Sequence, residues 1–480
     1  MKMKNKILIK SNITSKWLLW SALILMLTGC KDDFPENVVS DKSTQLSSIR
    51  ITNAGAAGTE TVEGVIDEDR KTISFPRIDP ETNFDQIRFE AVMSDGAKLD
   101  KESYTFPFVD GDSEKTIVVK VTNSPRYKEY FVTLRLRIPV FGADVAKRKT
   151  FDFTNNELGN PIYETFVSAL TRGSGFDGEH VLIVTRHAAG SHLLKVSDLR
   201  NGVANKIPLN LTGVSQGTFA VSVGDIVNGH TYVANLSGNT AASPLKIYHW
   251  TDPSAAPDVI ANINVGTIPG AGVRHGDNFT INLDDSGNGY IFFGDNAGTK
   301  VLRLSVANYT AVGDPLVITS TVNVGSWSSF TRVGNTDNYL FTGHDAPIMV
   351  VNSAGALTHT LGRTAIPIRS SAARVIEFNG ERYLLTTTAA RTGSEGTVMY
   401  LYDITRGANI VDALTAFEQS ERRPLLEYSF LGPANTSPST QTGWAVVKDD
   451  AGNDETLLIY SGASDAGFVV MEIPKKELED

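Results

Sequence analysis

The sequence has very little cysteine: one residue, Cys30, in a chain of 480. A single cysteine can form no internal disulfide, so hydrophobic cores must stabilise the folded parts. The chain also lacks a basic excess, because 44 Lys and Arg stand against 54 Asp and Glu, for a net charge of −10. Since binding to nucleic acid needs a basic face, we expect no nucleic-acid partner.

Helical patterns are nearly absent as well. No Gly-x-Ser-x-Gly turn leads into a helix, which argues against a hydrolase with a serine nucleophile. Charged residues make up only 20% of the chain, and its 41 glycines, with many Asn and Thr, mark frequent turns. This composition predicts an all-β protein, and the length predicts two domains.

The N-terminus has the layout of a targeting segment. Its positive charges come from five lysines, and an apolar run over residues 17–27 follows them. That run is too short to span a bilayer as a helix of the mature protein. We therefore predict that residues 1–29 are a signal peptide. Its removal would take the five lysines away and leave a net charge of −15.

The segment Leu27-Thr28-Gly29-Cys30 resembles a bacterial lipobox, in which small residues precede a cysteine that is lipidated after cleavage. The alternative is an ordinary secretory signal with a chance cysteine. The following Lys31-Asp32-Asp33 resembles the acidic tag that sends lipoproteins of the Bacteroidota to the outer cell surface. The resemblance implies a lipid anchor at Cys30 in the outer membrane, facing the cell exterior. Residues 30–45 would then be a flexible tether.

Residues 46–138 contain short segments in which apolar and polar side chains alternate. This period is typical of a two-sheet β-sandwich, with turns about every ten residues. We expect strands at residues 46–53, 63–66, 71–78, 86–93, 104–108, 115–123 and 129–137. Together with Ser94-Asp95-Gly96-Ala97, this segment resembles the immunoglobulin-like domains at the base of Bacteroidota surface lipoproteins. The resemblance implies that the domain is a spacer.

Residues 147–475 repeat one unit six times. In the unit at residues 277–306, strands at 277–283, 290–295 and 301–306 are separated by turns rich in Gly, Asn and Asp. A weaker fourth strand follows in five units, at a mean period of about fifty residues, which predicts a β-propeller. We expect six blades, with seven as the alternative count and a β-helix or sandwich as the alternative fold. Inner strands are expected at 165–167, 218–220, 278–280, 329–331, 373–375 and 443–445.

The sixth unit lacks a fourth strand, and a spare strand, residues 149–154, lies just before the first unit. Placed as the outer strand of the last blade, it would close the ring and cover an unpaired edge. We therefore predict a propeller closed by an N-terminal strand.

Propeller geometry divides the loops between two faces. Loops entering the inner strands and loops between second and third strands share one face, on which binding sites of propellers usually lie. Polar and aromatic residues gather there, and we predict a ligand site formed by Arg186, His187, Arg274, His275, Asp277, Asp295, Asn296, Trp327, His344, Asp345, Arg369 and Arg391.

These residue types suit carbohydrate, because planar hydrogen-bonding groups match hydroxyls and an aromatic face matches the C–H side of a sugar ring. The alternative is that they are ordinary solvated loop residues. An enzyme on the same face would use Asp277, Asp295 and Asp345 as paired carboxylates, as glycoside hydrolysis requires, or His275 as a lyase base. His344 is the second candidate base. No motif decides between binding and catalysis, and we favour binding.

One turn has a residue spacing that resembles a metal-binding loop. Asp284, Ser286 and Asn288, with Asp295 at the twelfth place, follow a calcium-loop spacing. However, Asp295 belongs to the second strand, at its opposite end from the turn. We therefore favour a plain hairpin turn, keep calcium as the alternative, and expect no other cofactor.

The whole layout resembles surface lipoproteins of Bacteroidota glycan-utilisation systems, with a lipid anchor, an immunoglobulin-like spacer and a distal binding module. The resemblance implies a carbohydrate ligand bound outside the cell and an outer-membrane transporter as a partner. A propeller glycosidase or lyase, and an envelope scaffold for protein partners, are the alternatives.

Overall fold

The computed structural model describes residues 42–109, 112–137, 140–154, 163, 166 and 170–477. The predicted signal peptide and the predicted lipidation site, Cys30, both lie outside the described residues. The chain divides into two compact units, and the boundary between them in the sequence lies between Pro139 and Val140. None of the helices in the described ranges is long and apolar enough to cross a membrane.

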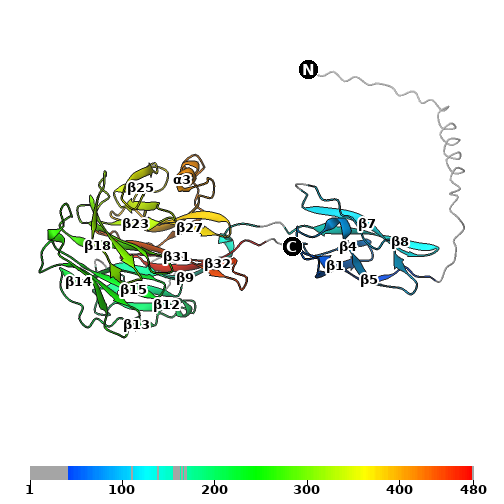
Figure 1. The fold of residues 1–480 in the computed structure, drawn as a ribbon, viewed down its shortest axis with the longest axis horizontal. Coiled ribbons are helices and arrows are strands. Elements are labelled where there is room, and N and C mark those ends of the chain that lie inside the picture. The colour runs from blue at the N-terminus through cyan, green and yellow to red at the C-terminus, as the bar shows by residue number, and fades with distance from the viewer. Residues whose placement is uncertain are drawn as a thin grey trace, which may run out of the picture. The chain divides into compact units, whose positions relative to one another are not determined.

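The first unit consists of two β-sheets (Figure 1). One sheet has the order β2-β1-β5, from Glu60–Glu63, Leu46–Ala54 and Phe89–Met93. The other has the order β3-β4-β8-β7-β6, from Val65–Asp67, Thr72–Ser74, Arg126–Arg135, Glu114–Asn123 and Lys98–Leu99. All pairs are antiparallel except β4 with β8. Alternate side chains of both sheets, such as Ile49, Ile51, Tyr130 and Val132, enter one core.

The expected strand at residues 104–108 is wrong. Only Tyr104 pairs, in an isolated bridge with Ile87, and no strand follows. Pro107 has no N–H to donate to a ladder, which explains why pairing stops there. Tyr104 and Phe106 are nevertheless buried, so their aromatic character served the core rather than a strand.

The second unit consists of six sheets in a propeller-like arrangement (Figure 1). The first sheet is formed by β10 (Thr171–Phe176), β11 (His180–Thr185), β12 (His192–Lys195) and β13 (Lys206–Pro208). The second is formed by β14 (Phe219–Val227), β15 (His230–Leu236), β16 (Leu245–Trp250) and β17 (Asp258–Ile263). The third is formed by β18 (His275–Leu283), β19 (Gly289–Asp295), β20 (Lys300–Ala307), β21 (Ala311–Val312) and β22 (Leu316–Thr319).

The other three are formed by β23 (Ser328–Arg332), β24 (Tyr339–Gly343), β25 (Ala346–Val351) and β26 (Leu357–Thr360); β27 (Ser371–Phe378), β28 (Glu381–Thr387), β29 (Val398–Asp403) and β30 (Leu426–Ser429); and β31 (Thr440–Lys448), β32 (Asp454–Ala463), β33 (Gly467–Pro474) and β9 (Lys149–Thr154).

The six sheets form a ring. The innermost strands contact one another in the order β10, β14, β18, β23, β27 and β31, and β31 contacts β10 again. Each sheet is packed on both faces: in β11, Val181 and Ile183 enter one core while Leu182 and Val184 enter the next. This explains why strands here are continuously apolar, since a strand buried on both faces needs no polar side. Within the described residues no single sheet closes on itself.

The last sheet contains the predicted N-terminal strand. In this sheet β9 pairs antiparallel with β33, with Phe153 opposite Phe468, and their rings stack at 5.0 Å. Figure 1 shows β9 next to the red C-terminal strands β31 and β32. The predicted placement of residues 149–154 as the outer strand of the last sheet is therefore confirmed.

The expected inner strand of the first sheet is wrong by a few residues. That strand is β10, and Phe166, predicted to lie in it, belongs to the segment before it. The sequence of β10, TRGSGF, is poor in β-forming residues because it crosses the neighbouring strand closely. A Cβ on Gly173 would lie 2.5 Å from the backbone nitrogen of Gly224, and one on Gly175 would lie 2.7 Å from that of Ile226.

Two helices were not expected. For the first unit of the repeat, the sequence predicts a third strand at residues 193–198, but β12 ends at Lys195 and a one-turn helix, α2 (Val196–Leu199), follows. The longer α3 (Ile410–Glu418) is capped by the side chain of Asn409, which accepts hydrogen bonds from the backbone N–H groups of Val411 and Asp412. Its buried residues follow a helical spacing and join the core beside β27, β28 and β29.

The axis of the ring is almost filled. Polar side chains of the six inner strands leave a cavity of about 10 Å³ between them. At its wall the Asp225 carboxylate lies 3.8 Å from the Arg374 guanidinium, and burial raises the Asp225 pKa to about 6 against the opposing effect of Arg374. A cavity of this size holds no sugar unit, so any ligand of the ring must bind at one of its faces.

Candidate functional site

Two faces of the second unit are distinguished by their connections. We call the face at which the inner strands begin the loop face, and the opposite face, with the turns between first and second strands, the turn face. The chain enters the unit on the turn face, where the Asn379 side chain donates hydrogen bonds to the carbonyl oxygens of Val140 and Gly142. The predicted ligand residues lie on the other face, away from the point at which the chain enters.

Four residues from three sheets meet at the loop-face end of the axis, and we call them the axial cluster: Arg172, Asp277, Trp327 and His344. The Arg172 guanidinium lies over the Trp327 ring at 5.1 Å and donates a hydrogen bond to the Ser437 carbonyl oxygen at 3.0 Å. Its Nη2 is 3.8 Å from Asp277. The Trp327 and His344 rings stack at 6.4 Å. Arg172 thus connects four sheets, and it was not among the predicted residues.

Trp327 does not offer the exposed aromatic face that the sequence suggested. Its side chain is 1% exposed, and its indole N–H donates a hydrogen bond to the Thr440 carbonyl oxygen at 3.2 Å. Since the ring is covered by Arg172 on one side, no sugar can stack on it without displacing the cluster. The prediction of Trp327 as a stacking platform is therefore wrong, because the indole ring fills the loop-face end of the axis and is buried there.

Two histidines of the predicted site are buried and neutral. Burial, with a smaller effect of Arg391, Arg369 and Arg172, lowers the His344 pKa to about 3. Burial likewise lowers the His275 pKa to about 4, although Asp295 and Asp277 oppose this. His275 is fully buried, and neither of its ring nitrogens has a hydrogen-bond partner among the described residues. Groups with so low a pKa, one of them shut off from solvent, are poor general bases, which argues against the lyase alternative.

The Asp295 carboxylate is hydrogen-bonded to the backbone of its own loop. Its Oδ1 accepts hydrogen bonds from the backbone N–H groups of Thr299 and Lys300, both at 2.9 Å, and the residue is buried. Asn296 follows it and is exposed, with its backbone N–H donating to the Arg274 carbonyl oxygen. A carboxylate already used to close a turn is not available for glycoside hydrolysis, so the geometry gives no support to Asp295 as a catalytic group.

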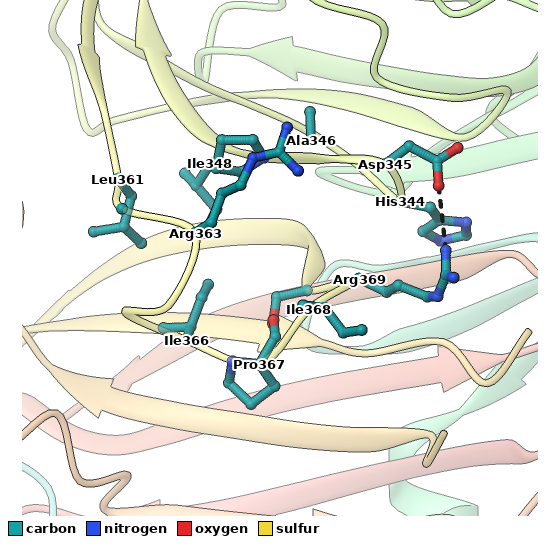
Figure 2. Close-up of a pocket in the computed structure, with 13 residues that line it drawn as sticks. His344, Asp345, Ala346, Ile348, Leu361, Arg363, Ile366, Pro367, Ile368 and Arg369 are labelled. Carbon is teal, nitrogen blue, oxygen red and sulfur yellow. Dashed lines mark hydrogen bonds and ion pairs between the residues drawn. The ribbon is translucent and has the colours of Figure 1, made fainter. Parts of the chain in front are cut away.

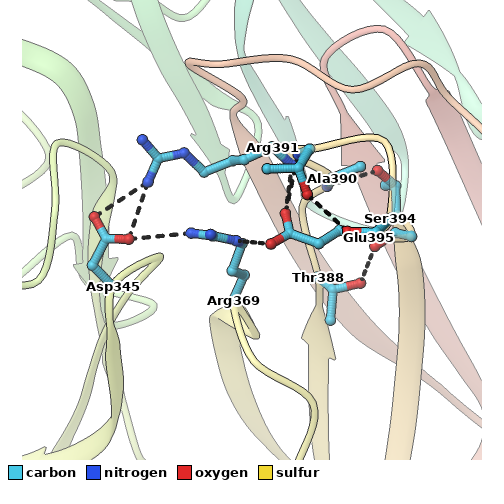
Figure 3. A network of polar contacts seen from close by, with 10 residues as sticks. Asp345, Arg369, Thr388, Ala390, Arg391, Ser394 and Glu395 are labelled. Atoms are coloured by element: carbon cyan, nitrogen blue, oxygen red, sulfur yellow. Dashed lines mark hydrogen bonds and ion pairs between the residues drawn. The ribbon is translucent and has the colours of Figure 1, made fainter.

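A second polar group lies further round the loop face, between the fourth and fifth sheets (Figure 3). Arg391 and Arg369 both bind the Asp345 carboxylate, at 3.0 and 3.2 Å, and Arg369 also binds Glu395 at 2.7 Å. Burial works to raise the Glu395 pKa, but the Arg369 hydrogen bond and the Arg391 backbone N–H outweigh it and hold the pKa below its ordinary value. The two positive charges of Arg369 and Arg391 balance the two negative charges of Asp345 and Glu395, and the group joins the fourth sheet to the fifth. We call these four residues the clamp.

Beside this clamp lies a small cavity of about 90 Å³ (Figure 2). Its wall is largely apolar, with Ile348, Leu361 and Ile366, while Arg363 and Arg369 reach its rim. It is smaller than a sugar ring needs, so it does not qualify as the main ligand site.

A larger hollow on the loop face, about 660 Å³, lies between the first and second sheets. Phe219 forms its floor and is 43% exposed, an unusual state for an aromatic ring of an inner strand. The Arg186 guanidinium covers part of that ring at 3.9 Å, and His187 lines the side. An exposed aromatic ring beside planar hydrogen-bonding groups is the combination that the sequence analysis sought at Trp327.

Arg274 lies close to the same region. Its Nε and Nη2 both donate to Oδ2 of Asp277, at 2.9 and 2.7 Å. Burial lowers the pKa values of both Arg172 and Arg186, and Asp277 opposes the effect in each case. Asp277 therefore lies within electrostatic range of three arginines that come from two sheets.

The turn that invited calcium is a hairpin turn held by its own backbone. The Asp284 Oδ1 accepts hydrogen bonds from the N–H groups of Ser286 and Asn288, both at 2.9 Å. Asn288 in turn accepts from the Asn308 N–H. Within the described ranges, no three His, Cys, Asp or Glu side chains are grouped so that they could hold a metal ion.

With this geometry in place, comparison with known proteins identifies the family. The family model described as "Domain of unknown function (DUF4623)" matches residues 32–476. The chain belongs to the DUF4623 family. No curated protein matches the chain.

A solved DUF4623 structure, a family protein from Bacteroides eggerthii, is 40% identical to this chain. The match covers 91% of this chain and 99% of that one, with a TM-score of 0.72. Two other similar structures are far more distant: regucalcin from Agrobacterium tumefaciens (13% identity, 70% and 96% covered, TM-score 0.39) and an endo-arabinase from Bacteroides thetaiotaomicron (12% identity, 65% and 98% covered, TM-score 0.31).

The structure of this DUF4623 chain places nine of the twelve predicted residues in three groups. Asp277, Trp327 and His344 meet at the axis with Arg172, and Arg274 adjoins Asp277. Asp345, Arg369 and Arg391 form the clamp, whereas Arg186 and His187 line the open hollow. Sequence reasoning missed Phe219 and Arg172. Phe219 lies in the expected inner strand 218–220, and four of the other five expected inner strands also contain an aromatic residue. Only its position at the start of its strand, next to the loop, could have set it apart.

Proposed function

We propose that this DUF4623 protein is a lipid-anchored cell-surface protein that binds carbohydrate on the loop face of a six-bladed β-propeller, without catalysing a reaction. The ring of six sheets and the pairing of β9 with β33 support the blade count and the closure. The lipobox-like Leu27-Thr28-Gly29-Cys30 supports the outer-membrane anchor. An outer-membrane transporter would be the partner that receives the glycan.

In this proposal the first unit is an immunoglobulin-like spacer. Its two sheets share one core, and the described part of it holds no cluster of three metal-ligating side chains. The spacer would carry the binding unit away from the membrane on the tether formed by residues 30–45.

The observation that carries the proposal is the hollow over Phe219. It is large enough for a sugar unit, has a half-exposed aromatic floor, and is edged by Arg186 and His187. A sugar ring could place its C–H side on Phe219 and its hydroxyls against the two polar side chains. By contrast, the candidate catalytic groups Asp295, His275 and His344 are buried or used by the backbone.

A glycan array with the soluble chain, residues 31–480, tests the proposal. We expect binding without release of product, and a Phe219→Ala variant should bind at least about tenfold more weakly, because loss of one stacking contact costs about 1.4 kcal/mol. Phe131, exposed on the first unit, gives the matched control, since Phe131→Ala removes an equally large ring elsewhere.

Three outcomes would contradict the proposal. Turnover of a polysaccharide, lost on changing Asp277 or Asp345 to Asn, would make the protein an enzyme. Equal loss of binding in the Phe219 and Phe131 variants would remove the hollow as the site. Binding to no glycan, together with recovery of a protein partner, would favour the scaffold.

A further inference from the structure

Positive charge gathers on the loop face of an otherwise acidic chain. The net charge is −10, yet five arginines lie on this face: Arg172, Arg186, Arg274, Arg369 and Arg391. Arg369 and Arg391 are matched by Asp345 and Glu395 in the clamp. Arg172 and Arg274 both lie beside Asp277, so the two regions of the face differ in charge balance.

Arg172 and Arg274 share a single carboxylate. Among the described residues, Asp277 is the one carboxylate within ion-pair distance of either guanidinium. Arg274 is hydrogen-bonded to it directly, whereas Arg172 stays 3.8 Å away, beyond a hydrogen bond. Two cations on one anion leave a local excess of positive charge, and a buried cation without full compensation is costly.

Arg172 contributes to this positive charge from a buried position. Its side chain is 9% exposed, and its Nε is buried without a hydrogen-bond partner among the described residues. Burial lowers the Arg172 pKa, Asp277 opposes this, and Arg186 and Arg274 lower it further, so Arg172 lies within electrostatic range of both other arginines. An anion bound above them would reduce this mutual repulsion.

Arg274 presents a free edge to that position. Its side chain is 40% exposed, and its Nε and Nη2 are taken by Asp277. Its Nη1 donates no hydrogen bond to any described residue, so that edge can bind a carboxylate from solvent. Arg186, which covers Phe219, links this position to the hollow.

We propose that the sugar bound over Phe219 is acidic, and that its carboxylate binds Arg274 and Arg186 with Arg172 reinforcing the positive potential from beneath. This inference rests on the proposed carbohydrate function and narrows its ligand to uronate-containing or sialic-acid-containing glycans. Specificity arises because a neutral sugar brings no negative charge to this position, so Arg172 and Arg274 would still share the single negative charge of Asp277.

The decisive experiment compares acidic glycans with their own carboxyl-reduced forms. Polygalacturonate and hyaluronan represent uronates, and sialyllactose represents sialates. We expect the wild-type chain to bind at least one acidic probe about tenfold or more tightly than its reduced form, as loss of a charge-assisted bidentate bond predicts. The preference should shrink as salt rises. Equal binding of both forms overturns the acidic ligand but leaves carbohydrate binding intact, whereas no binding to either form, or to neutral glycans, overturns both.

Variants locate the effect. Arg274→Gln should abolish the preference for the acidic form while binding of the reduced form persists, and Arg274→Lys, which keeps the charge, should retain part of it. Arg126→Gln removes the same charge from an exposed position on the first unit and is the control. If Arg274→Gln lowers the melting temperature strongly, the Lys variant and the salt dependence still decide. An unchanged preference in both Arg274 variants overturns the proposal.

Discussion

Burial keeps three histidines of the second unit neutral. The pKa values of His249 and His275 are lowered to about 4, and that of His344 to about 3, in each case first by burial. His249 also faces His230, whose Nδ1 is 2.8 Å from its Nε2, so that a proton on one ring disfavours a proton on the other. Neutral histidines inside a propeller-like ring act as polar packing, but they make the ring sensitive to acid.

This sensitivity can be measured. A folded pKa below the unfolded value of 6.5 means that the unfolded chain binds more protons between those two values. The free energy of unfolding should therefore fall as pH drops from about 6.5 towards 4, and the His275→Gln variant should lose less of it over the same range. Urea denaturation at several pH values provides the measurement. A slope identical in variant and wild type would remove His275 as a contributor.

Single residues also mark the limit of sequence reasoning. The polar residues of the loop face could be predicted from the repeat, because the position of a residue in the repeat fixes its face. Whether a side chain points into the axis or into solvent could not, because that depends on how six sheets converge. Trp327 and Phe219 occupy similar places beside their inner strands, yet one is buried as a plug and the other forms the floor of a hollow.

Among the elements, β9 has a special place because it completes a sheet whose other strands are far away in the chain. Phe153 is 5% exposed and stacks on Phe468 at an interplanar angle of 19°. The pairing spans six residues of β9, from Lys149 to Thr154. This strand was predictable, since the last repeat lacked a strand and the sequence before the first repeat held a spare one.

Removing the Phe153 ring should therefore weaken the whole ring of sheets. We expect Phe153→Ala to reduce the free energy of unfolding of the second unit by about 3 kcal/mol, the usual cost of truncating a buried Phe. Chemical denaturation measures the loss, and Phe131→Ala, with its ring 52% exposed, should cost much less. Equal effects of the two changes would show that β9 contributes little.

Other elements were harder to predict for local reasons. The strand β10 has two glycines where the neighbouring backbone passes closely, so its pattern is unlike a strand. Helix α3 was missed although its signal was present: Asn409 is a good N-cap, and Ile410, Ala413, Leu414 and Phe417 repeat at helical spacing. The helix lies between the third and fourth strands of its sheet, β29 and β30, where the four-stranded repeat predicts only a connection.

On the scale of the whole molecule, each hydrophobic core lies within one unit. The core of the first unit contains residues from Leu46 to Leu134, and the cores of the second contain only residues after Val140. A chain that begins at Val140 should therefore fold cooperatively by itself and bind the same glycans as the complete protein. Circular dichroism on heating and the glycan array would check this. Failure to fold would show that the second unit depends on the first.

The strand β9 also ties the structure to the order in which the chain is made. It is the first strand of its unit to leave the ribosome, and its partner β33 is the last. Five sheets can pair from neighbouring segments as they emerge, but the sixth cannot be completed until β33 has been made. The ring thus stays open until β33 emerges, so a product truncated before β33 would leave β9 without its partner strand and accessible to proteases.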